Sequence, residues 1–383
     1  MAPSIKVGLL LHFYQPWWQF PDVLARIADE CYRPIFSWLA RRTRFSFSAN
    51  VNWSLLELLA AHGHDDVIAL IKDAADRGKI ELFGTAAHHP ILPLCAPEET
   101  ERQIVRDREG KASLGIPPST CGGFYLPEYA FSGDVAAPLA RAGFSFVVAD
   151  DALFAAQHGT VPFDRVPKSG GLSVFLRARG WGTALSQGRY DFDRFDGEFA
   201  GGIAQWFGGR TGYVALATDA ETFGHHHKRL FEHLLKPMVE NWERHGSPIE
   251  ILPFGELLRI FGGRQCDMAV PPGTWSTENC DFVAGDHFPL WNSPKNIYHQ
   301  ALWALVDVAR RFGTDPAASE DVLKALSSCC WWQVSGRPSF NPRLMMLGAR
   351  KALDIVERCG DERTKAEGRA AYERLVRLPG INP

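Results

Sequence analysis

Short apolar runs alternate with amphipathic stretches over residues 1–262, and this alternation constrains the fold more than any other feature. Nearly continuous apolar strands separated by helices predict a parallel sheet with both faces covered. This many units in one segment favours a (β/α) barrel over an open sheet. The expected strands are 5–12, 45–51, 79–86, 122–126, 144–149, 172–177, 212–218 and 248–253, and the expected helices are 22–41, 54–61, 64–77, 97–114, 134–142, 193–207 and 226–243.

The pattern changes after residue 262. Residues 263–294 are rich in Gly, Pro and aromatic side chains, including Trp275 and Trp291. Flexible linkers seldom carry such aromatics, so we expect an ordered crossing segment. From residue 295 to 383 the pattern predicts a C-terminal α-helical bundle domain packed on the barrel, with helices at 295–313, 317–331, 341–358 and 362–377.

Composition excludes several classes of protein. The chain has 46% hydrophobic and 22% charged residues and a net charge of -3, which indicates a globular protein without the electrostatic footprint of a nucleic-acid or membrane binder. The only cluster of basic residues is Arg41, Arg42 and Arg44, which we interpret as a solvated helix end. Nothing indicates an oligomer, although one is possible.

The N-terminus and the cysteines predict a cytoplasmic location. The start, MAPSIKVGLLLHFYQPWW, resembles a first strand more than a signal peptide, and no window approaches the roughly 18 apolar residues of a membrane span. The eight cysteines show no CxxC spacing, so neither a zinc ribbon nor a redox pair is indicated. We therefore expect reduced thiols in the cytoplasm.

Polar side chains follow several of the expected strands. His12 ends the first, His88 and His89 follow the third, Glu128 follows the fourth, and Asp219 with Glu221 follow the seventh. The carboxyl ends of barrel strands share the face that holds the active site. We therefore expect these residues to converge on one cavity.

Glu128 is the most conspicuous of these residues because aromatic side chains flank it on both sides, in GGFYLPEYAF. Burying a carboxylate in such surroundings costs free energy, so the residue is expected to have hydrogen-bond donors or a functional role. The alternative is a helix N-cap, but Ser132 or Asp134 fills that role better.

Four segments together resemble the motifs of glycoside hydrolase family 57, in the right order: HFYQP (12–16), ELFGTAAHHPILPL (81–94), GGFYLPEYAF (122–131) and ALATDAETFGHH (215–226). The resemblance implies a (β/α)7-type distorted TIM barrel, with Glu128 as nucleophile and Asp219 as proton donor. His89 takes the histidine of the second motif, whereas Tyr14 stands where the first usually has a second histidine. A fifth motif is either WSTENCDF (275–282) or SSCCWWQ (327–333), and the choice stays open.

Two carboxylates across the scissile bond suit glycoside hydrolysis, and in retaining enzymes they stand about 5–5.5 Å apart. The nucleophile must stay ionised, so we expect donors near Glu128 from His12, His89 or Arg177. Glu221 either raises the pKa of the proton donor by like-charge repulsion, or faces away or caps the next helix.

Further side chains are expected to contact a sugar, because flat rings stack on sugar faces. Trp17 and Trp18 directly follow HFYQP, and Trp331 or Trp332 would close one wall of the cleft from the helical domain. The other predicted substrate-binding residues are Gln15, Tyr129, His225 and Trp275.

The run DAETFGHHH raises the alternative of a metal site. The sequence has no HxxxH pair, and adjacent histidines point in different directions, so at most one or two of His225, His226 and His227 can face one ion. We expect His225 or His226 to line a sugar subsite or the helix start, and we expect no metal or other cofactor.

The resemblance implies a retaining glycosidase or transglycosylase acting on α-glucosidic bonds, by α-amylase-like hydrolysis or 4-α-glucan transfer. The alternatives are a metal-dependent polysaccharide deacetylase on a related barrel and a non-catalytic glycan-binding family member. The second is disfavoured because both carboxylates are present. The exact sugar and linkage stay open.

Overall fold

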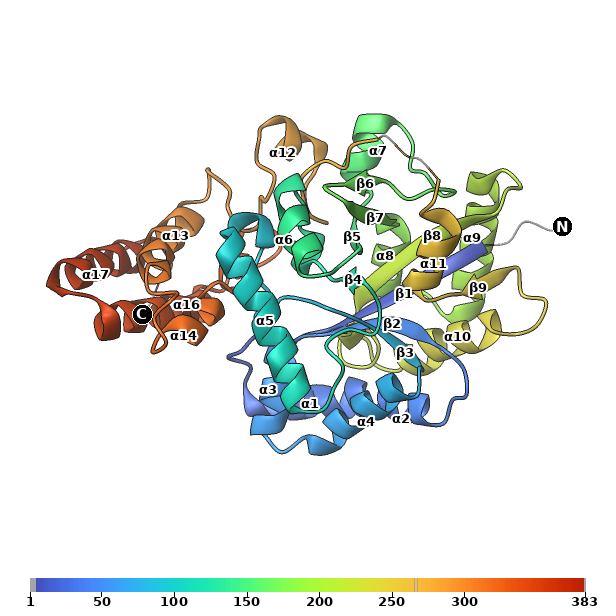
Figure 1. Ribbon diagram of the computed structural model, residues 1–383, viewed down its shortest axis with the longest axis horizontal. Coiled ribbons are helices and arrows are strands. Elements are labelled where there is room, and N and C mark those ends of the chain that lie inside the picture. Colours follow the sequence, from blue (N-terminus) through green and yellow to red (C-terminus); the bar gives the residue numbers. More distant parts are fainter. Residues whose placement is uncertain (1–4, 265, 267, 382–383) are drawn as a thin grey trace.

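The computed structural model describes residues 5–264, 266 and 268–381 and contains a parallel β-barrel (Figure 1). The strand order is β3-β2-β1-β8-β7-β5-β4, and a parallel bridge between Gly84 and Phe124 joins the last strand to the first. The ring therefore has seven parallel strands, and the predicted distorted (β/α)7 barrel is confirmed. Its strands are β1 (Ile5–Phe13), β2 (Phe47–Val51), β3 (Ile80–Phe83), β4 (Gly123–Phe124), β5 (Phe146–Asp150), β7 (Leu172–Arg177) and β8 (Gly212–Asp219).

Two further strands attach to this ring. β9 (Ile249–Ile251), the last predicted strand, pairs in parallel with the amino end of β1, from Ile5 to Val7. β6 (Lys168–Ser169) forms an antiparallel pair with β7. The sequence did not predict β6, because two residues are too short to give a period-2 pattern.

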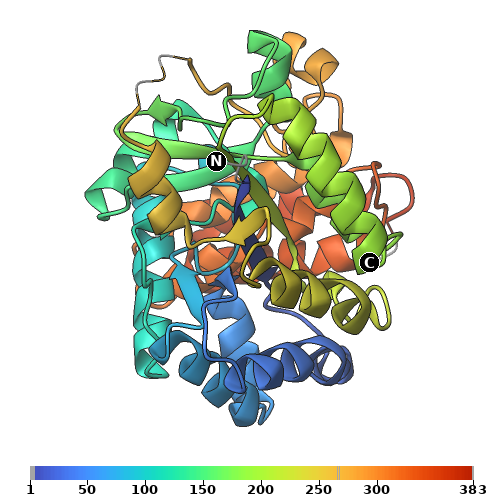
Figure 2. The same ribbon diagram turned by 90° about the vertical axis from the view of Figure 1, so that its right-hand side faces the viewer.

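Helices surround the strands, as the end-on view shows (Figure 2). Every predicted barrel helix is present, although 22–41 is divided by a π-helical turn at Ala28–Tyr32 and 226–243 begins with another at Phe231–Leu235. Three short helices, α7, α8 and α11, were not predicted. The helices are α1 (Pro21–Ile27), α2 (Arg33–Ala40), α3 (Trp53–Ala61), α4 (Asp65–Asp76), α5 (Pro97–Ser113), α6 (Ala136–Arg141), α7 (Ala152–His158), α8 (Arg179–Ser186), α9 (Phe192–Phe207), α10 (Lys236–Trp242) and α11 (Phe254–Phe261).

Aromatic side chains fill the barrel interior. The ring of Phe254, at the start of α11, lies 5.4 Å from the ring of Phe83 and 5.1 Å from that of Phe175. Gly8 of β1 admits this ring, because a Cβ there would lie only 2.7 Å from it. α11 thus closes the amino end of the barrel, which leaves the carboxyl end for the site.

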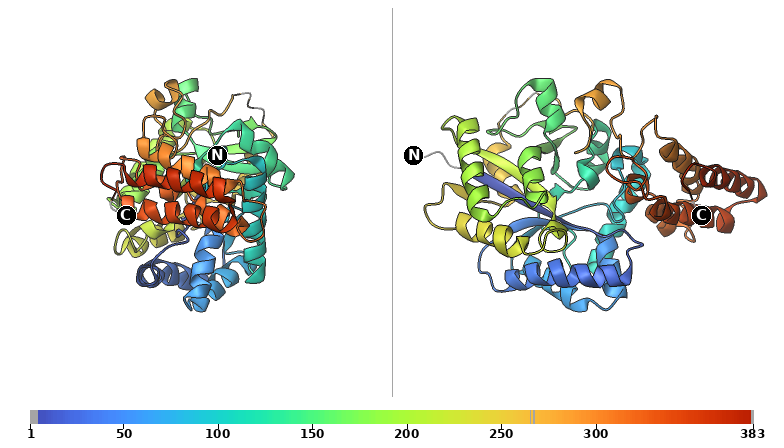
Figure 3. Two further views of the ribbon diagram at one scale, coloured as in Figure 1. Left: turned by 90° about the vertical axis from the view of Figure 1, so that its left-hand side faces the viewer. Right: turned by 180° about the vertical axis from the view of Figure 1, so that it is seen from behind.

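The C-terminal region is helical and lies against the carboxyl end of the barrel (Figures 1 and 3). It has its own core, which includes Trp291 and Trp331. Arg310 binds Glu99 of α5, with 2.5 Å between Nη2 and Oε2. The division at residues 262 and 294 stays a sequence prediction. The helices are α12 (Asn279–Val283), α13 (Ile297–Arg310), α14 (Ser319–Ala325), α15 (Cys329–Trp332), α16 (Pro342–Cys359) and α17 (Glu362–Val376).

Among the described residues, we find no helix with the length and apolar character that a bilayer crossing requires.

Candidate active site

The pleat of the strands explains which side chains enter the barrel. Alternate residues face opposite sides of a sheet. In β1, Leu10 packs in the aromatic interior while Leu9 and Leu11 face the surrounding helices. The next inward position is His12, and its neighbour in register on β8 is Asp219. By the same alternation Asn50, at the end of β2, faces inward; its strand-end position was a signal that sequence reasoning missed.

These strand ends open into a cavity of about 880 Å³ between the barrel and the C-terminal helices. Both candidate fifth motifs contribute to its wall, through Trp275 and Trp332. The cavity brings together most of the predicted site residues: His12, Gln15, Trp18, His89, Glu128, Tyr129, Arg177, Asp219, Glu221, Trp275 and Trp332.

The backbone around the predicted nucleophile is strained. Glu128 has φ 58° and ψ 20°, and the neighbouring Tyr129 has φ 51°. His89, across the cavity wall, has φ 57°. Non-glycine residues seldom adopt this left-handed conformation, and such strain concentrates at functional sites. Here it is found in three residues that line one cavity.

The donor to Glu128 is not the one that the sequence led us to expect. Trp275 Nε1 donates to Glu128 Oε2 at 2.7 Å, whereas His89 Nδ1 lies 3.7 Å from Oε1. Burial raises the pKa of Glu128 to about 7, against the lowering effect of the Trp275 hydrogen bond, and the charge of Asp219 raises it further. The prediction of His12, His89 or Arg177 as donors is therefore corrected to Trp275.

His12 and His89 line the cavity, and each is held by a partner at one ring nitrogen. His12 Nδ1 lies 2.6 Å from Asn50 Oδ1, and His89 Nδ1 lies 2.8 Å from Ser328 Oγ. Burial lowers the pKa of both histidines, which favours the neutral ring. Within the described chain, the buried Nε2 atoms of both rings lack a hydrogen-bond partner, as does the hydroxyl of Tyr129. Most buried polar atoms in proteins have a hydrogen-bond partner, so these three atoms set the cavity wall apart.

A column of stacked rings fixes the two histidines. Ring centroids are 4.3 Å apart between Tyr125 and His12, 4.9 Å between His12 and His89, and 4.1 Å between His89 and Tyr14. The Tyr14 hydroxyl lies 3.2 Å from Ser327 Oγ. The helical region thus holds this wall of the cavity through Ser327 and Ser328. Both serines belong to the candidate fifth motif SSCCWWQ, in which the prediction singled out the tryptophans and not the serines.

Arg177 is held by its own partners. Its Nη1 lies 3.2 Å from Asp150 Oδ2, its Nε donates to Ala217 O at 3.0 Å, and its guanidinium lies 4.7 Å from the centre of the Tyr129 ring. Arg177 thus lines the cavity as a fixed positive group beside Tyr129.

Asp219 and Glu221 differ sharply in exposure. Asp219 is exposed to the cavity, whereas Glu221 is buried and accepts hydrogen bonds from the Tyr32 hydroxyl, Gln15 Nε2 and the Tyr14 amide. Burial raises the pKa of Glu221 to about 8, and the charge of Asp219 contributes. Glu221 therefore lines the cavity as a firmly held group and does not face away along the strand.

The three histidines do point in different directions, as predicted. His225 Nδ1 lies 2.8 Å from Glu30 Oε2, and His227 Nε2 lies 2.9 Å from Ser186 O. Only His226 of the three is among the described residues that line the cavity. The assignment of His225 to substrate is corrected accordingly.

Two predicted tryptophans also lie outside the described wall of the cavity. Trp17 Nε1 donates to Lys324 O at 2.9 Å, so its ring joins the barrel to α14. Trp331 is 1% exposed and stacks on Trp303, with centroids 4.2 Å apart, in the core of the helical region. On a short helix, adjacent side chains face apart, so Trp332 reaches the cavity and Trp331 does not.

One group of potential metal ligands occurs in the described chain: Glu57, His88 and Glu320. It lies outside the cavity, at the contact between the barrel and α14. Its carboxylates already have cationic partners, since Arg106 Nε lies 2.7 Å from Glu320 and Lys324 Nζ lies 3.0 Å from Glu57. The ion pairs account for this cluster.

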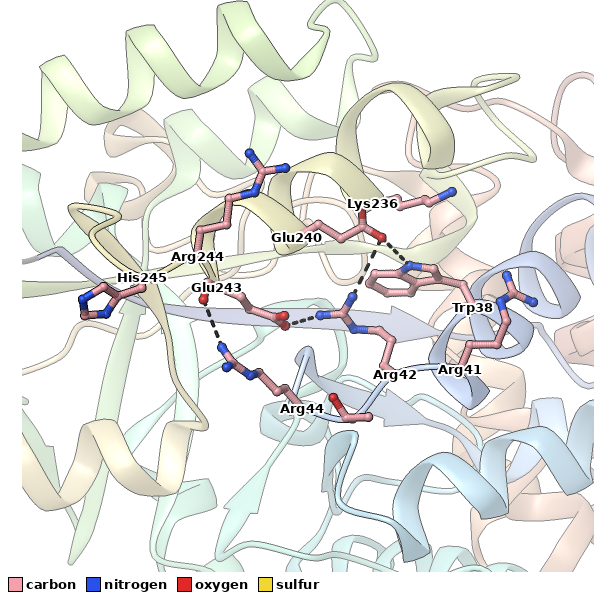
Figure 4. A pocket seen from close by; sticks show the side chains of 10 residues that line it. Trp38, Arg41, Arg42, Arg44, Lys236, Glu240, Glu243, Arg244 and His245 are labelled. Atoms are coloured by element: carbon pink, nitrogen blue, oxygen red, sulfur yellow. Dashed lines mark hydrogen bonds and ion pairs between the residues drawn. The ribbon is translucent and has the colours of Figure 1, made fainter.

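A basic pocket lies at the opposite, amino end of the barrel, in the loops that lead into β2 and β9 (Figure 4). The basic cluster of Arg41, Arg42 and Arg44 forms part of this pocket. Arg42 lies over the Trp38 ring, 4.4 Å from its centre, and pairs with Glu243. Arg44 donates to the Glu243 carbonyl at 3.2 Å. Arg44 thus covers the carboxyl end of α10, whereas Arg42 forms an ion pair and is not the solvated group that was expected.

Comparison with known proteins places these features in a family. The model of Glycosyl hydrolase family 57 matches residues 12–269. The chain is 28% identical over 160 residues to alpha-amylase 1 of Dictyoglomus thermophilum and 24% identical over 141 residues to the 4-alpha-glucanotransferase of Thermococcus litoralis. These alignments cover 40% and 37% of this chain but only 22% and 21% of the relatives. The chain thus matches about a fifth of the length of these curated relatives.

Solved structures share the fold. The 4-alpha-glucanotransferase from Thermococcus litoralis superposes with a TM-score of 0.72 at 17% identity, over 94% of this chain and 61% of that one. The branching enzyme from Pyrococcus horikoshii superposes with a TM-score of 0.68 at 16% identity, over 100% and 96%. Because the family model matches more than half of the sequence, the chain belongs to glycosyl hydrolase family 57.

Proposed function

We propose that the chain is a retaining glycosidase or transglycosylase that acts on α-glucosidic bonds of α-glucans or maltooligosaccharides. The observation that carries the proposal is the pairing of two carboxylates, Glu128 from the end of β4 and Asp219 from the end of β8, in one cavity. The polar side chains of His12, His89 and Tyr129 in the cavity wall support a ligand with hydroxyl groups. The names of the relatives, an alpha-amylase and a 4-alpha-glucanotransferase, support an α-glucan.

In the proposed mechanism Glu128 attacks the anomeric carbon while Asp219 gives its proton to the departing glycosidic oxygen. The C–O bond of the substrate breaks as the bond to Glu128 forms. Asp219 then takes a proton from water or from a sugar hydroxyl, which attacks the same carbon and releases Glu128. Two inversions at one carbon retain its configuration.

The surroundings of Glu128 support this role. A nucleophile must be ionised, and the Trp275 N–H bond favours the charged carboxylate against the cost of burial. The left-handed backbone at Glu128 and Tyr129 is strain of the kind that concentrates at functional sites. Arg177 and Glu221 are fixed by their own partners and would position sugar hydroxyls around the reacting carbon.

Product analysis on maltoheptaose tests the proposal. The wild-type protein should shorten the chain, and products longer than the substrate would identify transfer as well as hydrolysis. Turnover should survive EDTA and disappear in Glu128→Gln. Loss of turnover in EDTA would contradict a mechanism that needs only two carboxylates. Release of acetate from an acetylated glycan without cleavage of maltoheptaose would favour the deacetylase alternative, and binding without turnover by the wild type would indicate a glycan-binding protein.

A further inference from the structure

A second hollow of about 500 Å³ adjoins the catalytic cavity. We call it the outer groove; it lies between residues 280–298 and residues 334–340. The same segments form both walls, since Glu278 lines the cavity while Asp281 lines the groove, and Arg337 lines both. The ion pair between Arg337 and Asp281, at 3.4 Å, spans the shared rim. The groove therefore continues the cavity along the helical region.

Exposed apolar side chains concentrate along this path. The large hydrophobic residues that are exposed in the described chain are Phe20, Val105, Val283, Ile297 and Phe340. Phe20 lines the cavity, Ile297 and Phe340 line the groove, and Val283 precedes the groove residue Ala284. Single exposed apolar residues are normal on a protein surface, but four of these five lie in or beside the two hollows, which is typical of a binding surface.

The groove combines a fixed aromatic ring with polar groups. Phe340 is 52% exposed, and its ring packs edge-on against Tyr298 at 5.2 Å. Tyr298 is itself held, because its hydroxyl donates to Pro379 O at 2.7 Å. Polar side chains also line the groove, among them Asn296, Ser335 and Arg337. A flat ring beside hydrogen-bonding groups suits a sugar, whose faces are apolar and whose edges carry hydroxyls.

We propose that the outer groove binds the distal part of an α-glucan chain whose reacting end occupies the catalytic cavity. This inference rests on the function proposed above. Continuity through Arg337 selects this occupant over a separate partner, because a chain leaving the cavity on this side meets Phe340 next. Phe340 then acts as a specificity residue for long substrates and touches no reacting atom.

The test compares Phe340→Ala with the wild type on maltoheptaose and on maltotriose. We expect KM for maltoheptaose to rise about five- to tenfold with kcat unchanged. This rise is at the lower end of the range of affinity losses that follow removal of one aromatic stacking contact. KM for maltotriose should change less than twofold. Val105→Ala, on α5 and equally exposed at 49%, is the matched control and should alter neither substrate. Melting temperatures of both variants exclude a folding defect.

An unchanged KM for both substrates in Phe340→Ala, or an equal rise for both, would contradict the proposed role of the outer groove in binding long substrates. The proposed function would stay intact. A wild-type protein that neither binds nor turns over any α-glucan would contradict the proposed function. It would then also contradict the proposed role of the outer groove, which depends on that function. A wild-type dimer that Phe340→Ala dissociates in gel filtration would assign the groove to a second copy of the chain and would also overturn the proposal.

Discussion

Two inward-facing glutamates at opposite ends of the barrel have opposite environments. Glu81, near the amino end, accepts hydrogen bonds from Ser48 Oγ at 2.6 Å and from the amides of Phe254 and Gly255 at 2.8 and 3.0 Å. Glu128, beyond the carboxyl end, has one donor, Trp275, and a left-handed backbone. The first carboxylate holds the start of α11 in place, and the second is poised for a ligand. Burial of a charge contributes to stability only where donors compensate it.

The largest expected difference between the two is in turnover. Glu128→Gln should lower kcat by about three to five orders of magnitude, because it removes the proposed nucleophile. Glu81→Gln should leave kcat of the folded protein within about twofold. Rates on maltoheptaose for both variants check this, and a Glu128→Gln protein that keeps a tenth of the wild-type rate would exclude the role.

The free energy of unfolding should fall in Glu81→Gln, the variant whose turnover is expected to change little. Glu81→Gln sets an amide N–H₂ against one backbone donor, because Phe254 N and Gly255 N donate to different oxygens of Glu81. The variant also loses the charge, and the free energy of unfolding should fall by about 2–3 kcal/mol, the order expected for hydrogen bonds to a charged group. Urea unfolding followed by circular dichroism measures it. An unchanged midpoint would mean that Glu81 does not hold α11.

The pH dependence of stability sharpens the comparison. The pKa of Glu128 is raised in the folded protein from 4.5 to about 7, so the folded state holds a proton there that the unfolded state has lost. Wild-type stability should therefore fall as pH rises from 4.5 to 7, relative to Glu128→Gln. At pH 8 we expect the variant to be more stable by about 1–3 kcal/mol. Unfolding of both proteins at pH 4.5 and pH 8 tests the direction of this change. A wild-type protein that gains stability over the variant as the pH rises would contradict it.

The smallest expected effect concerns Trp275. Its N–H bond favours ionised Glu128, so Trp275→Phe should raise the pKa of that carboxyl further. The acidic limb of kcat/KM should move to higher pH by about one unit, the size of one such hydrogen bond. Trp332→Phe, whose ring also lines the cavity, is the control and should leave the limb in place. A limb that moves equally in both variants would mean that the bond is not responsible.

The barrel and the convergence of its strand ends could be predicted from the sequence, because both depend on local periodicity. His12 and Asp219 were found by their positions after apolar runs, and Asn50 could have been found in the same way. The hydrogen bonds of Trp275 and Ser328 could not be predicted, since neither residue follows an expected barrel strand and both come from segments that fold back over the barrel. Nor does the sequence distinguish Trp331 from Trp332, because that difference depends on the rotation of one helical turn.

Covalent trapping tests the central claim most directly. A fluorinated maltosyl fluoride that forms the glycosyl-enzyme but loses it slowly should inactivate the wild-type protein, and mass spectrometry of its peptides should place one added fluoromaltosyl group on Glu128. Asp219→Ala should still be labelled when the leaving group is fluoride, because fluoride needs little protonation. A label on any other residue, or a product of inverted configuration, would contradict the assignment of Glu128 as nucleophile.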